Sequence, residues 1–261
     1  MNGVVAIFRK ELRGYFTSPI AYVVAAVFWG LAGFFFFNIL VRVISFSQQV
    51  DLFAQFGQEN PFDAATILSQ QFLNLLGTLS LFLLPIFTMS SYAEERRRGT
   101  MELLATSPIT NLEVALGKWL AVWVFFITLL LPPLVYHVLV LSSANPAVDY
   151  RLTLMGYVGL TLLAGSVMAL GLFISSLTDS TLIAAVATFG LILLLWVIDA
   201  AAGQEENWIA ATLRHVSLLQ QYSNWVQGIL SSSSLILFLS IIVLGLFATV
   251  QSVESLRWQQ S

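Results

Sequence analysis

The chain has 261 residues, of which 58% are hydrophobic and only 10% are charged, and its mean hydropathy is +0.85. Soluble domains carry about 25% charged residues, so this composition excludes an ordinary soluble protein and predicts an all-α membrane protein surrounded by membrane lipid. The net charge of −3 includes no basic tail for a nucleic-acid partner, and the lack of cysteine excludes disulfides and thiolate metal sites.

The first predicted element is a short amphipathic helix over residues 3–17. Its apolar residues share one helical face: Val5, Phe8, Leu12 and Phe16. Its basic residues, Arg9, Lys10 and Arg13, share another. This pattern is typical of a helix lying in the membrane interface, although basic residues that only anchor the next span on the cytoplasmic side would also explain it.

Six apolar runs follow, and each is assigned as a transmembrane helix because a crossing needs about 20 residues. They cover about residues 20–44, 72–93, 113–141, 152–177, 181–198 and 235–253. With the first helix they form a single membrane domain over residues 1–261.

Two local patterns predict helix starts. Ser18 followed by Pro19 is an N-cap with a proline at the first helical position, at the start of the first span. Thr110 followed by Glu113 is a capping box directly before the third span.

Prolines and small residues predict the shape and packing of the spans. Pro132 and Pro133 remove backbone hydrogen bonds and should kink or break the third span, and Pro85 should affect the second span more mildly. Small faces on the fourth span should let other helices of the subunit pack closely. They are formed by Gly165 with Ala169 and by Gly171 with Ser175.

The basic residues predict the orientation, because an even number of spans places both termini on one side. That side carries Arg9, Lys10, Arg13, Arg96, Arg97, Arg98, Lys118 and Arg257, which are 8 of the 11 basic residues. The opposite side carries Arg42, Arg151 and Arg214, and the acidic residues divide evenly. Both termini are therefore expected in the cytoplasm.

Two segments on the opposite side, residues 45–70 and 199–234, are longer than simple connections. In the second segment four apolar residues recur at helical spacing: Leu218, Tyr222, Trp225 and Ile229. They predict an amphipathic helix at the outer interface, serving either as an anchor or as a gate.

Catalytic and metal-binding patterns are missing from the sequence. His137 and His215 have no second ligand three or four residues away, so both are interpreted as hydrogen-bonding residues near the interface. No nucleophile elbow is present, and Gly117-Lys118 lacks the earlier glycine of a phosphate-binding loop. We therefore expect no enzyme activity and no bound cofactor, and transport energy must come from another subunit because the spans are almost free of charge.

The densest charge cluster, Glu94 to Arg98, follows the second span. Beyond Gly99 a short apolar stripe is formed by Met101, Leu104 and Ala105, and Ser107-Pro108 ends it. A short helix with charged flanks and an apolar face suits a groove on a soluble partner. The alternative, a positive-inside anchor with a solvated loop, explains the arginines but not the glutamates or the apolar turn.

At these residues the chain resembles the ABC-2 type permeases, the membrane subunits of ATP-binding-cassette transporters. The matching residues are Glu94-Glu95-Arg96, Gly99-Thr100-Met101-Glu102, Leu104, Ser107-Pro108 and Leu116-Gly117-Lys118. The N-terminal FRKELRGYFTSPIAY further resembles the gliding-motility-associated branch. Two departures are Ser90-Ser91, where a basic residue is expected, and Ser231, where an acid is common.

The resemblance implies an elbow helix before the first span and a coupling helix that binds the ATPase. The elbow would include Arg9, Lys10, Glu11 and Arg13. The coupling element would include Glu94, Glu95, Arg96, Arg97, Arg98, Gly99, Thr100, Met101, Glu102, Leu103, Leu104, Ser107 and Pro108.

The implied function is that of an exporter permease in the bacterial inner membrane. Its partners would be two ATPase subunits, which bind ATP and Mg²⁺, a second permease copy or paralogue, and an outer-side accessory subunit. An intramembrane enzyme would need a buried catalytic pair, which the sequence lacks. A membrane scaffold that tethers an ATPase without transporting anything remains an alternative.

Overall fold

The computed structural model describes residues 2–54, 63–100, 109–144, 150–201 and 217–260, and all regular structure in these ranges is helical. The helices are α1 (Asn2–Thr17), α2 (Pro19–Ala54), α3 (Ala64–Thr88), α4 (Ala93–Arg97), α6 (Asn111–Ser142), α7 (Tyr150–Leu177), α8 (Thr181–Ala201), α10 (Leu218–Val226) and α11 (Ser232–Gln260). The predicted all-α class is confirmed.

Five helical segments in the described ranges are long and apolar enough to cross a membrane. They are Pro19–Val50, Ala64–Arg97, Asn111–Ser142, Tyr150–Leu177 and Ser232–Ser255. The predicted fifth span corresponds to a shorter apolar helix, Thr181–Trp196. The protein is therefore an integral membrane protein, and the count of six crossings stays a prediction.

The predicted span boundaries differ most from the structure at α2, α3 and α11, and α11 ends at Gln260 rather than near residue 253. Helix α2 begins at Pro19, as predicted, but continues to Ala54 rather than ending near residue 44. Helix α3 begins eight residues before the predicted start, because Asp63 caps it by accepting a hydrogen bond from the Thr66 amide at 3.1 Å.

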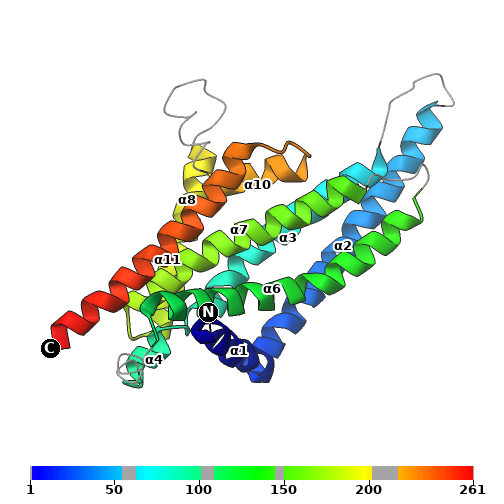
Figure 1. The fold of residues 1–261 in the computed structure, drawn as a ribbon. Coiled ribbons are helices and arrows are strands. Elements are labelled where there is room, and N and C mark those ends of the chain that lie inside the picture. Colours follow the sequence, from blue (N-terminus) through cyan, green and yellow to red (C-terminus); the bar gives the residue numbers. More distant parts are fainter. Residues whose placement is uncertain (1, 55–62, 101–108, 145–149, 202–216, 261) are drawn as a thin grey trace.

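Helix α7 lies at the centre of the bundle and packs against α3, α6, α8, α10 and α11 (Figure 1). Small residues allow these approaches, as predicted. A Cβ atom at Gly171 would lie 2.3 Å from Thr88 Oγ1 of α3, and one at Gly245 of α11 would lie 2.8 Å from the Ala169 backbone. The small faces of α7 therefore pack against helices of the same subunit.

The two ends of the bundle carry different elements (Figure 1). Helices α1 and α4 and the C-terminal end of α11 lie at one end, whereas α10 lies at the other. Ser252 of α11 donates a hydrogen bond to the Ser176 carbonyl of α7 at 3.4 Å, which ties the C-terminal helix to the end that carries α4. Both termini thus lie at the same end of the molecule.

The double proline was predicted to kink or break the third span; the break is excluded, because α6 continues from Asn111 through Pro133 to Ser142, and the kink stays a prediction. Pro133 has no N–H to offer the carbonyl of Leu129, four residues earlier. The Trp29 indole of α2 donates to that carbonyl at 2.9 Å instead. A side chain from a neighbouring helix therefore replaces the missing backbone hydrogen bond. Helix α3 likewise continues past Pro85.

Helix α10 confirms the predicted helix between the fifth and sixth apolar runs. Ser217 caps it by accepting from the Gln220 amide at 3.1 Å. Leu218, Tyr222 and Trp225 are buried, whereas Ile229 lies beyond the helix and is exposed. Because Tyr222 donates to the Leu73 carbonyl at 2.6 Å, α10 is fastened to α3 and is not only a surface anchor.

Candidate coupling site

The start of α6 is set by the predicted capping box. The Thr110 hydroxyl accepts from the Glu113 amide at 3.3 Å, and the Glu113 carboxylate accepts from the Thr110 amide at 3.0 Å. These reciprocal bonds satisfy amides that a helix start leaves free. They begin α6 at Asn111 and so place Lys118 on its second to third turn.

Gly117 lets α1 lie directly against α6. A Cβ atom at this position would lie 2.8 Å from Ile7 Cβ and 3.1 Å from the Val4 carbonyl oxygen, so no larger residue fits without displacing α1. Ile7 is buried in this contact, while Val5 and Phe16 of the predicted apolar face are exposed. The close packing brings Glu11 of α1 alongside Lys118.

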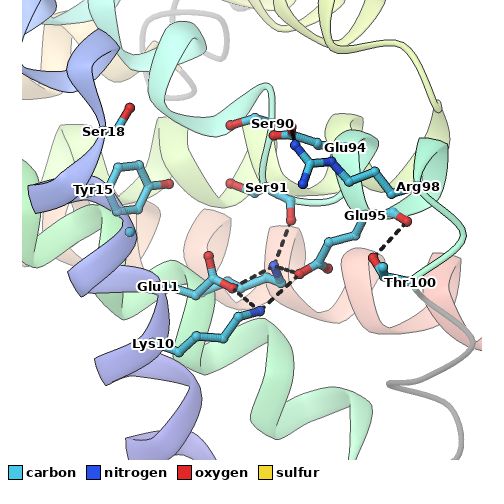
Figure 2. A pocket seen from close by; sticks show the side chains of 12 residues that line it. Lys10, Glu11, Tyr15, Ser18, Ser90, Ser91, Glu94, Glu95, Arg98 and Thr100 are labelled. Atoms are coloured by element: carbon cyan, nitrogen blue, oxygen red, sulfur yellow. Dashed lines mark hydrogen bonds and ion pairs between the residues drawn. The ribbon is translucent and has the colours of Figure 1, made fainter.

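Lys118 joins three segments of the chain through one buried ammonium group. Its side chain is only 3% exposed. The Nζ atom donates to Glu11 Oε1 at 3.1 Å, to Glu95 Oε1 at 2.8 Å and to the Ser91 carbonyl at 2.7 Å. Figure 2 shows these acceptors converging from α1, the connection after α3, and α4. All three ammonium donors are therefore used.

We call this cluster of Lys118, Glu11, Glu95 and Ser91 the lysine junction. The more exposed Lys10 lies 3.2 Å from Glu11 Oε1 and 3.6 Å from Glu95 Oε1, so two lysines balance two glutamates. Burial acts to raise the pKa of Glu11, but the attraction of Lys118 and Lys10 outweighs it and holds that pKa below its ordinary value. Glu11 is thus ionised at neutral pH.

Ser175 of α7 holds the beginning of α4. Its buried hydroxyl accepts from the amides of Tyr92 and Ala93, each at 3.1 Å, and donates to the Met89 carbonyl at 2.9 Å. Tyr92, at the N-cap position, makes no side-chain cap of its own. A serine from a distant helix therefore supplies the cap.

The end of α4 is a Schellman motif. The amide of Gly99 donates to the Arg96 carbonyl at 3.1 Å, and that of Thr100 donates to the Glu95 carbonyl at 3.0 Å. Gly99 has φ +67°, a conformation that glycine adopts without steric cost. The Gly-Thr pair of the sequence motif therefore ends α4 abruptly and turns the chain.

A family model described as "ABC-2 family transporter protein" matches residues 42–250, well over half of the chain. The chain belongs to the ABC-2 transporter family. No curated protein matches it. Membership assigns this ABC-2 chain to the membrane component of an ABC transporter, which is generally not catalytic itself and works with an ATPase partner.

The structure divides the predicted coupling residues of this ABC-2 chain into two groups. Glu95 and Arg96 point inward, since Glu95 binds Lys118 and Arg96 donates to the Ser176 carbonyl at 3.2 Å. Glu94 forms surface ion pairs with Arg97 and Arg98. Gly99 and Thr100 form the turn that ends α4. The other predicted residues lie outside the described residues: Met101, Glu102, Leu103, Leu104, Ser107 and Pro108.

The predicted elbow residues divide in a similar way. Glu11 and Lys10 belong to or adjoin the lysine junction, whereas Arg9 and Arg13 are exposed. Sequence reasoning treated Lys118 as an orientation signal and Ser175 as a packing residue, and so missed both roles. A lysine placed inside an apolar run was the available signal, because a buried charge requires a counterion.

Among the described residues, no group of three or more His, Cys, Asp or Glu is placed to hold a metal ion. His137 is fully buried, and it makes hydrogen bonds, as predicted. Its Nε2 lies 3.2 Å from Ser69 Oγ and its Nδ1 lies 3.4 Å from the Tyr157 hydroxyl, so neighbouring spans satisfy it. His215 lies outside the described residues.

Proposed function

We propose that the chain is the permease subunit of an ATP-driven exporter, with six spans and both termini in the cytoplasm of a bacterial cell. Two ATPase subunits would bind ATP and Mg²⁺, a second permease copy or paralogue would complete the pathway, and an outer-side accessory subunit would extend it. We also propose a relation to the gliding-motility-associated branch. The family match begins at residue 42, so it does not cover the N-terminal segment behind this relation.

The lysine junction is the observation that carries the proposal. Glu95 of α4 and Glu11 of α1 both bind the ammonium group of Lys118 on α6. Separating a buried ion pair costs about 3–5 kcal/mol, because each charge is left without a partner. A force on α4 therefore moves α1 and α6 as one body, which suits rigid-body switching between inward-facing and outward-facing states.

The surface of α4 suits contact with a soluble partner. The side chains of Arg97 and Arg98 are 61% and 66% exposed, and their only acidic partner among the described residues is Glu94. Arginines of this kind recognise carboxylates through paired hydrogen bonds. The exposed face of α4 and the segment that follows it would bind the ATPase, while the inward face transmits its movement.

Thiol labelling offers a test, because the natural chain contains no cysteine and any introduced thiol is unique. Thr78 is exposed on α3, in a cleft of about 90 Å³ shared with Phe189 and Ile192 of α8. We expect a membrane-impermeant maleimide, applied from outside to liposomes carrying Thr78→Cys and the ATPase, to react faster when ATP is present. Glu102→Arg should abolish the ATP effect while membrane insertion is retained.

A scaffold would give a different result in the same experiment. It would bind the ATPase but show the same labelling rate with and without ATP. Unchanged labelling in a complex that hydrolyses ATP would therefore contradict the transport function and favour the tethering role.

A further inference from the structure

Two adjoining cavities lie beside the lysine junction. The larger, about 730 Å³, is bounded by polar side chains of α1, α4 and the connection between α3 and α4. The smaller, about 290 Å³, shares Tyr15, Ser18, Ser90 and Glu94 with it. Figure 2 shows these shared residues at one side of the larger cavity. The two cavities therefore adjoin, one beside the charged cluster and the other beside α2.

The walls of the two cavities differ in character. The larger cavity contains both signs of charge, including Lys10, Glu95 and Arg98. The smaller cavity is lined by Ile20 and Val24 in the first turns of α2 and by Ile86 in the last turn of α3. Because α2 and α3 are membrane-spanning helices, the apolar end lies where lipid chains begin. A ligand that fills both parts has a charged head and an apolar tail.

One atom indicates the chemistry of the head. Glu95 accepts from Lys118 through Oε1, but its Oε2 is buried and has no hydrogen-bond partner among the described residues. A buried carboxylate oxygen without a donor is costly. A ligand N–H or O–H could supply the missing hydrogen bond, and a cationic donor is favoured because Glu94 also lines the cavity.

We propose that the adjoining cavities bind one phospholipid with a primary ammonium headgroup. The ammonium would lie in the larger cavity beside Glu95 and donate to its carboxylate, whose Oε2 would turn toward it. The phosphate would lie between the cavities, near Ser18, Ser90 and the Arg97 guanidinium, and an acyl chain would follow Ile20 and Ile86. The apolar wall selects a lipid over a soluble phosphoamine.

Headgroup competition tests the proposal. Purified protein is equilibrated in detergent micelles with equal amounts of phosphatidylethanolamine, phosphatidylcholine and phosphatidylglycerol of identical chains, and the retained lipid is measured by native mass spectrometry. We expect phosphatidylethanolamine to be retained about tenfold over phosphatidylcholine, since trimethylation removes every N–H donor while keeping the charge. Equal retention, or a preference for phosphatidylglycerol, would overturn the proposal.

A matched pair of variants locates the site. Gly14 lines the larger cavity, and a Cβ atom there would meet nothing within 4 Å, so Gly14→Leu narrows the cavity without a clash at Cβ. Gly30 on α2 is equally open and serves as the control through Gly30→Leu. We expect only Gly14→Leu to lose the preference, with both variants melting like the parent. Retention of the preference in Gly14→Leu would place the lipid elsewhere and refute the assignment.

A soluble competitor tests whether the headgroup comes from a membrane phospholipid or from a free phosphoamine. Free phosphoethanolamine carries the ammonium and phosphate but no acyl chain. We expect it to leave the bound lipid in place at millimolar concentration. Displacement at a concentration equal to that of the lipid would show that the apolar wall contributes nothing, and would contradict a lipid ligand.

Discussion

Helix α6 carries two buried polar residues, Lys118 and His137, that are held in different ways. They stand nineteen positions apart, or about 28 Å along the helix. Lys118 makes three contacts of 2.7–3.1 Å to two carboxylates and a carbonyl. His137 makes two longer contacts, and the Phe72 ring meets it edge-to-face at 5.1 Å.

The difference shows how a membrane helix accommodates polar groups of different charge. A buried ammonium is tolerated only when every donor is used and counterions are close. A buried imidazole can be held by weaker hydrogen bonds and by aromatic packing. The end of α6 at Lys118 is therefore a connection that fails when one charge is removed, whereas the end at His137 tolerates loss of a single partner.

The largest loss of stability is expected from Lys118→Met, which leaves the partly buried carboxylates of Glu11 and Glu95 without their shared cation. Loss of such a partner costs about 3–5 kcal/mol, so thermal unfolding in detergent should show a large loss of stability. Lys10→Met is the control, because its side chain is 69% exposed and its surface ion pairs contribute little. Similar stability losses in the two variants would contradict the claim that the buried lysine, and not the exposed one, holds the two glutamates.

Acid should weaken the same end of α6. The pKa of Glu11 is lowered in the folded state by Lys118 and Lys10, against the opposing effect of burial, so the folded state binds its proton less tightly than the unfolded chain. The resulting stability is present above the ordinary value of 4.5 and is lost as the pH falls through the lower folded pKa. Between pH 7 and pH 3, the unfolding temperature should fall less steeply in Glu11→Gln than in the parent protein. An equal fall in the two proteins would contradict the ionisation of Glu11.

A smaller loss of stability is expected from Trp29→Phe, because Trp29 of α2 bonds to Leu129 in the C-terminal half of α6. The change keeps an aromatic ring but removes the indole N–H that donates to the Leu129 carbonyl. Pro133 has no N–H with which to replace it. One lost hydrogen bond costs about 1 kcal/mol. Trp196→Phe, at an exposed tryptophan of α8, is the matched control. Equal unfolding temperatures in the two variants would show that the indole bond does not support α6.

The smallest loss is expected from Ser69→Ala, which removes one partner of His137. Hydrogen bonds between membrane helices contribute about 0.6 kcal/mol on average, and the aromatic packing around His137 remains. Chemical denaturation in mixed micelles would measure the change. A loss comparable to that of Lys118→Met would show that the neutral end of α6 is as dependent on a single contact as the charged end.

Features set by neighbouring residues could be predicted from the sequence. The capping box of Thr110 and Glu113 and the amphipathic spacing within α10 concern residues three or four apart, which helical geometry brings together. The match of Gly99-Thr100 to a family motif was also visible. Its physical reason, the Schellman turn that ends α4, follows from the same local geometry.

Features that depend on distant residues could not be predicted in this way. The Trp29 indole lies 100 positions from the carbonyl it satisfies, and Ser175 lies 83 positions from the Tyr92 amide it caps. The sequence placed Glu94 and Glu95 side by side without showing which faces inward. The position of α4, which Ser175 of α7 holds at its first residues, decides that Glu95 rather than Glu94 binds Lys118.

The most direct test of the account measures whether the lysine junction moves as one body. Arg97 on α4 and Leu112 on α6 are both exposed and can carry spin labels after replacement by cysteine. In the reconstituted complex with its ATPase, we predict that the distance between the labels stays the same with and without ATP, while labelling of Thr78→Cys in a parallel sample changes. A clear change in the α4–α6 distance, with the Thr78→Cys response intact, would contradict transmission through Lys118.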